Sequence, residues 1–226
     1  MKESDVKNNF EENWIQLQKE EKRFDLFKKF YSEPEIHPEM YADYECAFTA
    51  YYLREYQCKN ILDVGSYRWF LYGLMSCHNL TSVDVRQRRQ MVPYEKIVTT
   101  DAKNLPFPNR SFDTIISLSS VEHFGLSRYC DEFDVSADTQ FFNEAKRVLK
   151  KDGILIFSTH ITARKPFIIF NAHRVYSLEM IQDLCFGLNI ISQKFYSRST
   201  NSLCLYSEIT NKENEWDNYC GCWRKI

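Results

Sequence analysis

The chain has 226 residues, of which 44% are hydrophobic, 15% aromatic and 27% charged, the balance of an ordinary soluble globular protein. Its 29 lysine and arginine residues nearly match its 31 aspartate and glutamate residues, which leaves a net charge of −2. No overall positive field exists to attract nucleic acid or an anionic membrane, so neither is expected as a partner. The apolar runs are far shorter than the ~20 residues of a membrane span.

The first residues, Met1 to Asn9, are charged and lack the apolar core of a secretory signal, so we expect a cytoplasmic protein. The eight cysteines are therefore interpreted as reduced thiols. The pair Cys220 and Cys222 has neither a second pair nor a nearby histidine to complete a zinc site. No metal is predicted, and this pair is assigned to a terminal strand.

The N-terminal segment has a helical pattern. Aromatic and apolar residues at steps of three and four predict an amphipathic helix over residues 10–30, interrupted by Pro34 and Pro38. A second helix is predicted from Tyr41 to Tyr56. Because this aromatic stripe has too little core of its own, we expect residues 1–58 to form a helical cap over the strand ends of a domain at 59–226, as a single compact unit.

From Asn60 the pattern changes to short apolar runs separated by helical segments, which is typical of parallel strands buried on both faces. A helix is predicted from Asp138 to Lys150, with Asp138 as its N-cap and Gly153 just past its end. This order predicts an α/β fold with a doubly wound sheet, whose ligands bind at the carboxyl ends of the strands. The predicted strands are residues 61–64, 80–85, 96–98, 114–118 and 154–158.

Two features at the predicted strand ends indicate a nucleoside cofactor. Gly65 follows the first strand, and Asp84 ends the second, 21 residues after Asp63. A glycine there lets backbone approach a ligand, and the acidic side chain can accept hydrogen bonds from both ribose hydroxyls. A dinucleotide needs two further glycines at the places of Tyr67 and Phe70, so NAD is disfavoured.

An ordered set of motifs resembles the class I S-adenosylmethionine-dependent methyltransferases. The resemblance covers residues 60–209 and departs from the family pattern at Tyr67, where a second glycine is usual. It implies a Rossmann-like, mostly parallel sheet of seven strands with an antiparallel last strand, and S-adenosylmethionine as cofactor. The motifs are ILDVGS at 61–66, SVD at 82–84, TDA at 100–102, LPFPNRSFD at 105–113, VEHF at 121–124 and RVLKKDG at 147–153. The implied cofactor-binding residues are Asp63, Gly65, Ser66, Asp84, Val85, Asp101, Ala102 and Ser119.

A narrower resemblance concerns EHFGLSRY at 122–129 and FNAHRV at 170–175. Both are similar to motifs of an uncharacterised methyltransferase-like family of bacteria and nematodes. That family has no settled substrate. The resemblance to it implies that Cys220 to Trp223 belong to the last strand. The pattern of the residues leaves this strand open between 203–209 and 219–225.

Methyl transfer from a sulfonium is an in-line displacement, so the protein mainly aligns donor and acceptor and excludes water. A hydroxyl acceptor must also lose a proton, which a histidine or carboxylate can take. His123 is the predicted base, with Glu122 beside it and with His173 and His160 as alternatives. We therefore predict a methyltransferase that O-methylates a small molecule, and a sugar or sugar-derived metabolite is one candidate for this substrate. A homodimer is one candidate for the oligomeric state.

Structural alternatives stay open for most of these residues. Asp63 could cap a helix, Asp84 and Asp101 could be turn or loop residues, and Glu122 with His123 could orient a turn. A basic cluster at 86–89 is either a solvated face or a site for a phosphate-bearing acceptor. For the whole chain, the alternative is a methyltransferase-like protein that binds the cofactor without catalysis and acts through partners.

Overall fold

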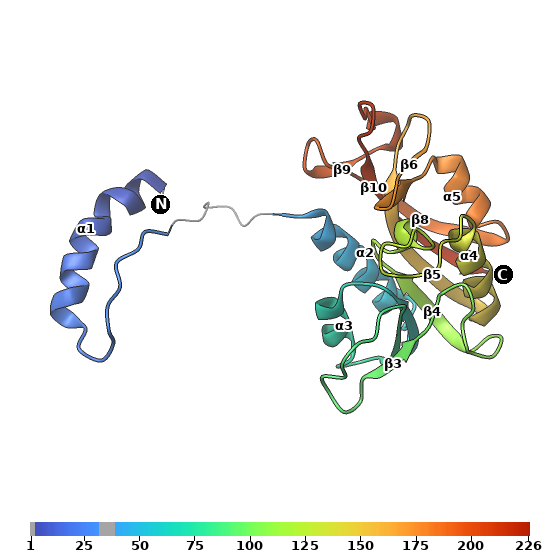
Figure 1. The fold of residues 1–226 in the computed structure, drawn as a ribbon, viewed down its shortest axis with the longest axis horizontal. Coiled ribbons are helices and arrows are strands. Elements are labelled where there is room, and N and C mark those ends of the chain that lie inside the picture. Colours follow the sequence, from blue (N-terminus) through green and yellow to red (C-terminus); the bar gives the residue numbers. More distant parts are fainter. Residues whose placement is uncertain (1–2, 32–38) are drawn as a thin grey trace. The chain divides into compact units, whose positions relative to one another are not determined.

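A computed structural model describes residues 3–31 and 39–226 and divides the chain into two units, residues 1–40 and 41–226 (Figure 1). In the first unit, α1 spans Glu3–Glu20. The predicted extension of this helix to Phe30 is wrong, because the chain turns back and the rings of Phe10 and Phe30 pack edge to face, 5.2 Å apart. Pro34 and Pro38 lie outside the described residues.

The predicted second helix is confirmed as α2 (Tyr41–Glu55), which belongs to the larger unit. The packing of residues 1–40 over the strand ends stays a prediction. Within the described residues, no helix has both the length and the apolar character of a membrane span.

Five strands of the larger unit are parallel and lie in the order β3-β2-β1-β4-β5. The chain runs outward from β1 to β3 and then returns to the other side of β1, so the strand order reverses between β1 and β4. This is the switch point at which doubly wound sheets bind ligands. The five strands are β1 (Asn60–Val64), β2 (Asn79–Asp84), β3 (Lys96–Thr99), β4 (Phe112–Ser117) and β5 (Leu149–Ile161).

The other half of the sheet is antiparallel. The last strand, β10 (Asp217–Lys225), lies between β5 and β8 (Leu188–Ser197), which confirms the placement of Cys220 to Trp223. The short β9 (Ser202–Cys204) pairs with β8 at the edge. Among the described residues the sheet thus has eight strands, one more than expected. A separate hairpin joins β6 (Phe167–Ile169) and β7 (His173–Val175), and the 3-10 turns are η1 (Val121–His123) and η2 (Tyr206–Glu208).

Helices cover both faces of this sheet (Figure 1). On one face, α3 (Arg68–Leu74) packs with α2 against strand residues such as Ile61. On the other, α4 (Ala137–Val148) and α5 (Leu178–Leu184) pack against residues such as Leu62. Successive residues of β1 point to opposite faces and are buried on both, which explains its unbroken apolar run.

Two details of α4 differ from the prediction. Its N-cap is Ser136, whose side chain makes no capping bond, whereas the Asp138 carboxylate accepts a hydrogen bond of 3.0 Å from the Tyr176 hydroxyl. Gly153 lies inside β5 and does not end the helix. A side chain there would come within 2.8 Å of a neighbouring backbone oxygen, so this glycine permits close strand packing.

Candidate active site

A pocket opens at the carboxyl ends of β1, β2 and β4, at the switch point of the sheet. It brings together most of the residues predicted for the cofactor, together with the predicted base. Those that line it are Gly65, Asp84, Val85, Asp101, Ala102, Ser119 and His123.

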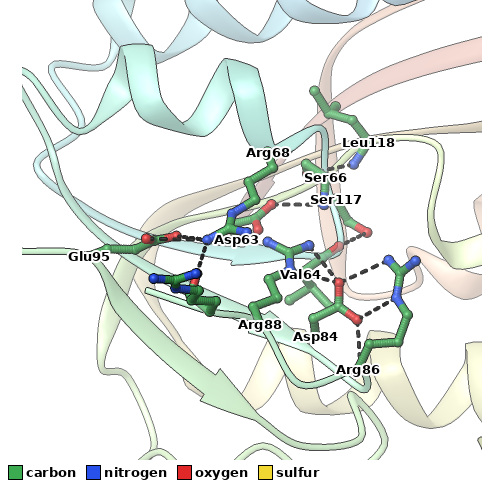
Figure 2. A network of polar contacts seen from close by, with 11 residues as sticks. Asp63, Val64, Ser66, Arg68, Asp84, Arg86, Arg88, Glu95, Ser117 and Leu118 are labelled. Atoms are coloured by element: carbon green, nitrogen blue, oxygen red, sulfur yellow. Dashed lines mark hydrogen bonds and ion pairs between the residues drawn. The ribbon is translucent and has the colours of Figure 1, made fainter. Parts of the chain in front are cut away.

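Asp63 and Ser66 lie beneath the pocket wall. The Asp63 carboxylate is fully buried and accepts a hydrogen bond of 3.1 Å from the backbone N–H of Ser66 (Figure 2). The Ser66 hydroxyl in turn accepts one of 2.9 Å from the backbone of Leu118, just after β4. Burial raises the pKa of Asp63 to about 6. These two side chains join the turn after β1 to the end of β4 and shape the pocket from behind.

Gly65 is required by the close approach of two loops. Its φ is +75°, and a Cβ built on it would lie 2.1 Å from the Ser120 hydroxyl. Tyr67, at the place of the family's second glycine, donates a hydrogen bond of 2.9 Å from its hydroxyl to Glu45. The turn thus keeps the one glycine that its backbone needs.

Two arginine side chains bind the carboxylate of Asp84 (Figure 2). Arg86 donates to both oxygens at 3.0 Å, and Arg88 donates to one oxygen at 2.9 and 2.6 Å. With a further bond from the Arg86 backbone at 2.8 Å, the acceptor sites of the carboxylate are filled. Burial alone would raise the pKa of Asp84, but the bonds from Arg86 and Arg88 lower it.

The two arginines differ in exposure. The Arg88 side chain is 10% exposed, whereas that of Arg86 is 51% exposed. The Arg86 guanidinium also lies 4.2 Å from the ring centre of Tyr129, and both residues line the pocket. Arg88 is therefore a structural partner of Asp84, and Arg86 is the one that a ribose could displace.

His123 lies at the same pocket and has one ring nitrogen available. Its Nδ1 is 2.6 Å from the carbonyl oxygen of Ala172, so Nδ1 carries the proton and Nε2 keeps its lone pair. Burial lowers the pKa of His123 to about 4, which keeps the ring neutral. The Nε2 atoms of His123 and His160 lie 3.8 and 3.7 Å from the same oxygen of Glu122.

Glu122 is fully buried beneath these rings and does not line the pocket. Burial raises its pKa to about 8, so it is a neutral acid at pH 7. The Thr159 hydroxyl donates to one of its oxygens at 3.2 Å. His173, also absent from the pocket wall, packs against His160 with ring centres 4.6 Å apart. Within the described residues, no three metal-binding side chains are placed to share an ion.

Glu45, on α2, is a site residue that sequence reasoning missed. Its buried carboxylate accepts hydrogen bonds from Ser119 at 2.8 Å, from Tyr67 at 2.9 Å and from Asn218 at 3.5 Å. Burial raises its pKa to about 7. The available signal was a glutamate on the buried face of a helix, between Ala42 and Thr49.

Comparison with solved structures identifies the fold. The 1,6-didemethyltoxoflavin-N1-methyltransferase of Burkholderia thailandensis, crystallised with 1,6-didemethyltoxoflavin and S-adenosylhomocysteine, has a TM-score of 0.61 at 13% identity, over 99% of this chain and 86% of that chain. The N-methyltransferase NodS of Bradyrhizobium japonicum, in complex with S-adenosylhomocysteine, has a TM-score of 0.54 at 14% identity, over 81% and 86%. The [4+2]-cyclase SpnF has a TM-score of 0.59 at 15% identity, over 80% of each chain. The fold is thus that of the S-adenosylmethionine-dependent methyltransferases.

The family follows from the sequence. The model of a family described as "Caenorhabditis protein of unknown function, DUF268" matches residues 80–221, more than half of the chain. The protein belongs to this family. No curated protein matches the sequence.

Proposed function

We propose that the protein is an S-adenosylmethionine-dependent methyltransferase that O-methylates a hydroxyl group of a small molecule. One observation carries the proposal: a single pocket at the switch point combines Gly65, Asp84 and Asp101 with the neutral ring of His123. S-adenosylmethionine requires a ribose acceptor and an acceptor for the adenine amino group but no pyrophosphate site. The chain offers both carboxylates and lacks the glycines that a pyrophosphate needs.

The residues fit the cofactor in distinct roles. The backbone of Gly65 would face the methionine part, Asp84 the ribose and Asp101 the adenine, with Val85, Ala102 and Ser119 completing the wall. Asp84 can accept ribose hydroxyls once the half-exposed Arg86 side chain leaves one of its oxygens. Asp63 and Ser66 hold the turn that presents Gly65. The bound cofactor would supply the methyl group.

His123 would take the proton of the acceptor hydroxyl at Nε2. The bond from Nδ1 to Ala172 fixes the ring and its tautomer. Glu122 does not reach the pocket and acts as a positioning residue behind the imidazoles. His173 is held as the alternative base. The neighbour crystallised with 1,6-didemethyltoxoflavin supports a small-molecule acceptor, and the choice of oxygen rests on His123.

Calorimetric titration with S-adenosylmethionine tests the cofactor assignment. We expect binding, and we expect Asp84→Asn to weaken it while Asp183→Asn, an exposed carboxylate on α5, does not. A screen of free metabolites for S-adenosylhomocysteine release then tests catalysis. Absence of binding to the wild-type chain would overturn the proposal.

A second candidate function is a cofactor-binding protein without methyl transfer. One observation favours it: the neighbour named a [4+2]-cyclase shares the fold at a TM-score of 0.59. Binding of the cofactor without turnover across the metabolite screen would support this candidate.

A further inference from the structure

Four rings form a cluster beside the pocket. His160 and His173 lie with ring centres 4.6 Å apart, and Trp216 packs against both, at 5.2 Å from His160 and 4.4 Å from His173. His123, which lines the pocket, is 6.3 Å from His173. The cluster therefore extends from the predicted base to the turn before β10.

Polar atoms of this cluster lack hydrogen-bond partners. Trp216 Nε1, His160 Nδ1 and His173 Nε2 are buried and unpaired in the part of the chain that the structure describes. The indole N–H is only a donor, and each neutral imidazole has a nitrogen that can donate. Buried polar atoms without partners mark places where a ligand or water completes the bonding. The indole N–H, together with any imidazole nitrogen that carries the proton, favours a ligand rich in acceptor oxygens.

Two arginines add positive charge at the rings. Arg128 Nη1 lies 3.3 Å from His123 Nδ1 and donates to Ala172 at 3.0 Å, and the Arg198 guanidinium lies 4.7 Å from the ring centre of Trp216. Both side chains are exposed, and neither has an ion pair with a carboxylate among the described residues. Besides burial, the charges of both arginines lower the pKa of His173.

Two acidic groups lie near these arginines and rings. Burial keeps Glu122 protonated at pH 7. Asp217 accepts hydrogen bonds from the backbone of Arg198 at 2.7 Å and from Asn211 at 3.0 Å, so both of its oxygens are bound to neutral donors, and it makes no ion pair with the Arg198 guanidinium among the described residues. The rings thus lie beside two guanidinium groups that have no carboxylate ion-pair partner among the described residues.

We propose that Arg128 and Arg198 bind an anionic group of the acceptor, a phosphate or a carboxylate, over the rings of His173 and Trp216. The proposal rests on the proposed function, since it makes this cluster the acceptor side of the methyl-transfer site. Guanidinium groups bind such oxyanions by paired, charge-assisted hydrogen bonds. The acceptor hydroxyl would then lie toward His123, which belongs to both the cluster and the pocket.

Binding of simple anions to the full chain, without cofactor, tests the proposal. Inorganic phosphate and acetate would be titrated separately while the histidine ring signals are followed by NMR. Variants that each lack one histidine assign these signals. We expect one of the two anions to bind saturably and to shift His123 and His173. Arg128→Gln and Arg198→Gln should each weaken binding by roughly tenfold or more, and Arg54→Gln, an exposed arginine on α2, should not.

Equal affinity of all three variants, or ring signals that respond to neither anion, would overturn the proposal. Titration of the same samples with S-adenosylmethionine separates the two hypotheses. Cofactor binding without anion binding would contradict the anion site alone. Anion binding without cofactor binding would contradict the proposed methyl transfer alone.

Discussion

At the scale of single residues, the state of His123 predicts the pH dependence of turnover. Its folded pKa of about 4 lies below the ordinary ~6.5, so the neutral form persists down to acidic pH. We expect kcat to rise with pH through about 4 and to show no step near 6.5. A pH profile at saturating cofactor measures this, and a step near ~6.5 would contradict the assignment.

Replacement of His123 tests its role directly. His123→Gln should lower the chemical rate by ~10²- to 10⁴-fold, because the proton acceptor is lost, and should leave cofactor affinity nearly unchanged. Single-turnover kinetics and calorimetry provide the two readouts. The matched comparison is His173→Gln, and a larger loss of rate there would transfer the base role to His173.

Replacing Arg86 and replacing Asp84 should have opposite effects on cofactor affinity. Arg86→Ala should tighten cofactor binding, because it frees a carboxylate oxygen that is now occupied. Asp84→Ala should weaken binding by roughly 1.5–3 kcal/mol, the contribution of hydrogen bonds to a charged group. Calorimetry compares both with the wild type. Weaker binding in Arg86→Ala would show that Arg86 contacts the cofactor rather than competing with it.

The buried acid Glu122 links stability to pH. Its folded pKa of about 8 exceeds the ordinary value of 4.5 for a glutamate, so the folded chain holds the proton more tightly than the unfolded chain. The stability that this tighter proton binding gives the folded chain is fully present below the pKa of Glu122 in the unfolded chain and is lost as pH rises through about 8. His123, with its lowered pKa, acts in the opposite direction but only below ~6.5.

We therefore expect the free energy of unfolding of the wild type to fall between about pH 6.5 and pH 8.5, by more than that of Glu122→Gln. Urea denaturation at several pH values measures both slopes. Glu45, whose pKa is raised to about 7, contributes a slope of the same sign in both proteins; because its charge also raises the pKa of Glu122, the difference between the slopes reports Glu122 together with this coupling. Parallel slopes would show that Glu122 is ionised in the folded chain.

At the scale of elements, the turn between β1 and α3 decides the shape of the pocket. Gly65→Ala places a methyl group against Ser120 at a φ of +75°, and we expect a loss of about 1–3 kcal/mol in unfolding free energy together with weaker cofactor binding. Gly73→Ala is the matched control, since nothing lies within 4 Å of its Cβ in α3. Equal losses of unfolding free energy in the two variants, measured by urea denaturation, would contradict the steric argument.

At the scale of the whole molecule, both hydrophobic cores lie within residues 41–226. A chain beginning at Tyr41 should therefore unfold cooperatively. Exposed aromatic residues such as Phe24 and Phe27 motivate the predicted cap. We accordingly expect loss of residues 1–40 to weaken cofactor binding, measured by calorimetry on the shortened chain. Unchanged affinity would contradict the cap and leave the fold intact.

The sequence by itself determined the parallel half of the sheet and indicated Gly65 and Asp84, which line the pocket at its carboxyl edge. Strands β1 to β4 were predicted within two residues at each end, because a strand buried on both faces is a local apolar run. Gly65 and Asp84 were identifiable because a strand end followed by a turn is also a local signal. The predicted helix to Phe30 failed because a chain that folds back can imitate helical spacing.

The tertiary structure alone decided which side chains meet. Glu45 and Ser119 are 74 positions apart, and His123 contacts Ala172 across 49. Arg86 is only two residues from Asp84 in the chain, yet its position between Asp84 and Tyr129 depends on a loop from beyond β4. Periodicity reports only which face of an element is buried, whereas the pKa and the available lone pair of a side chain depend on neighbours brought from distant segments. The chemistry of the site therefore emerges only when the sheet assembles its strand ends.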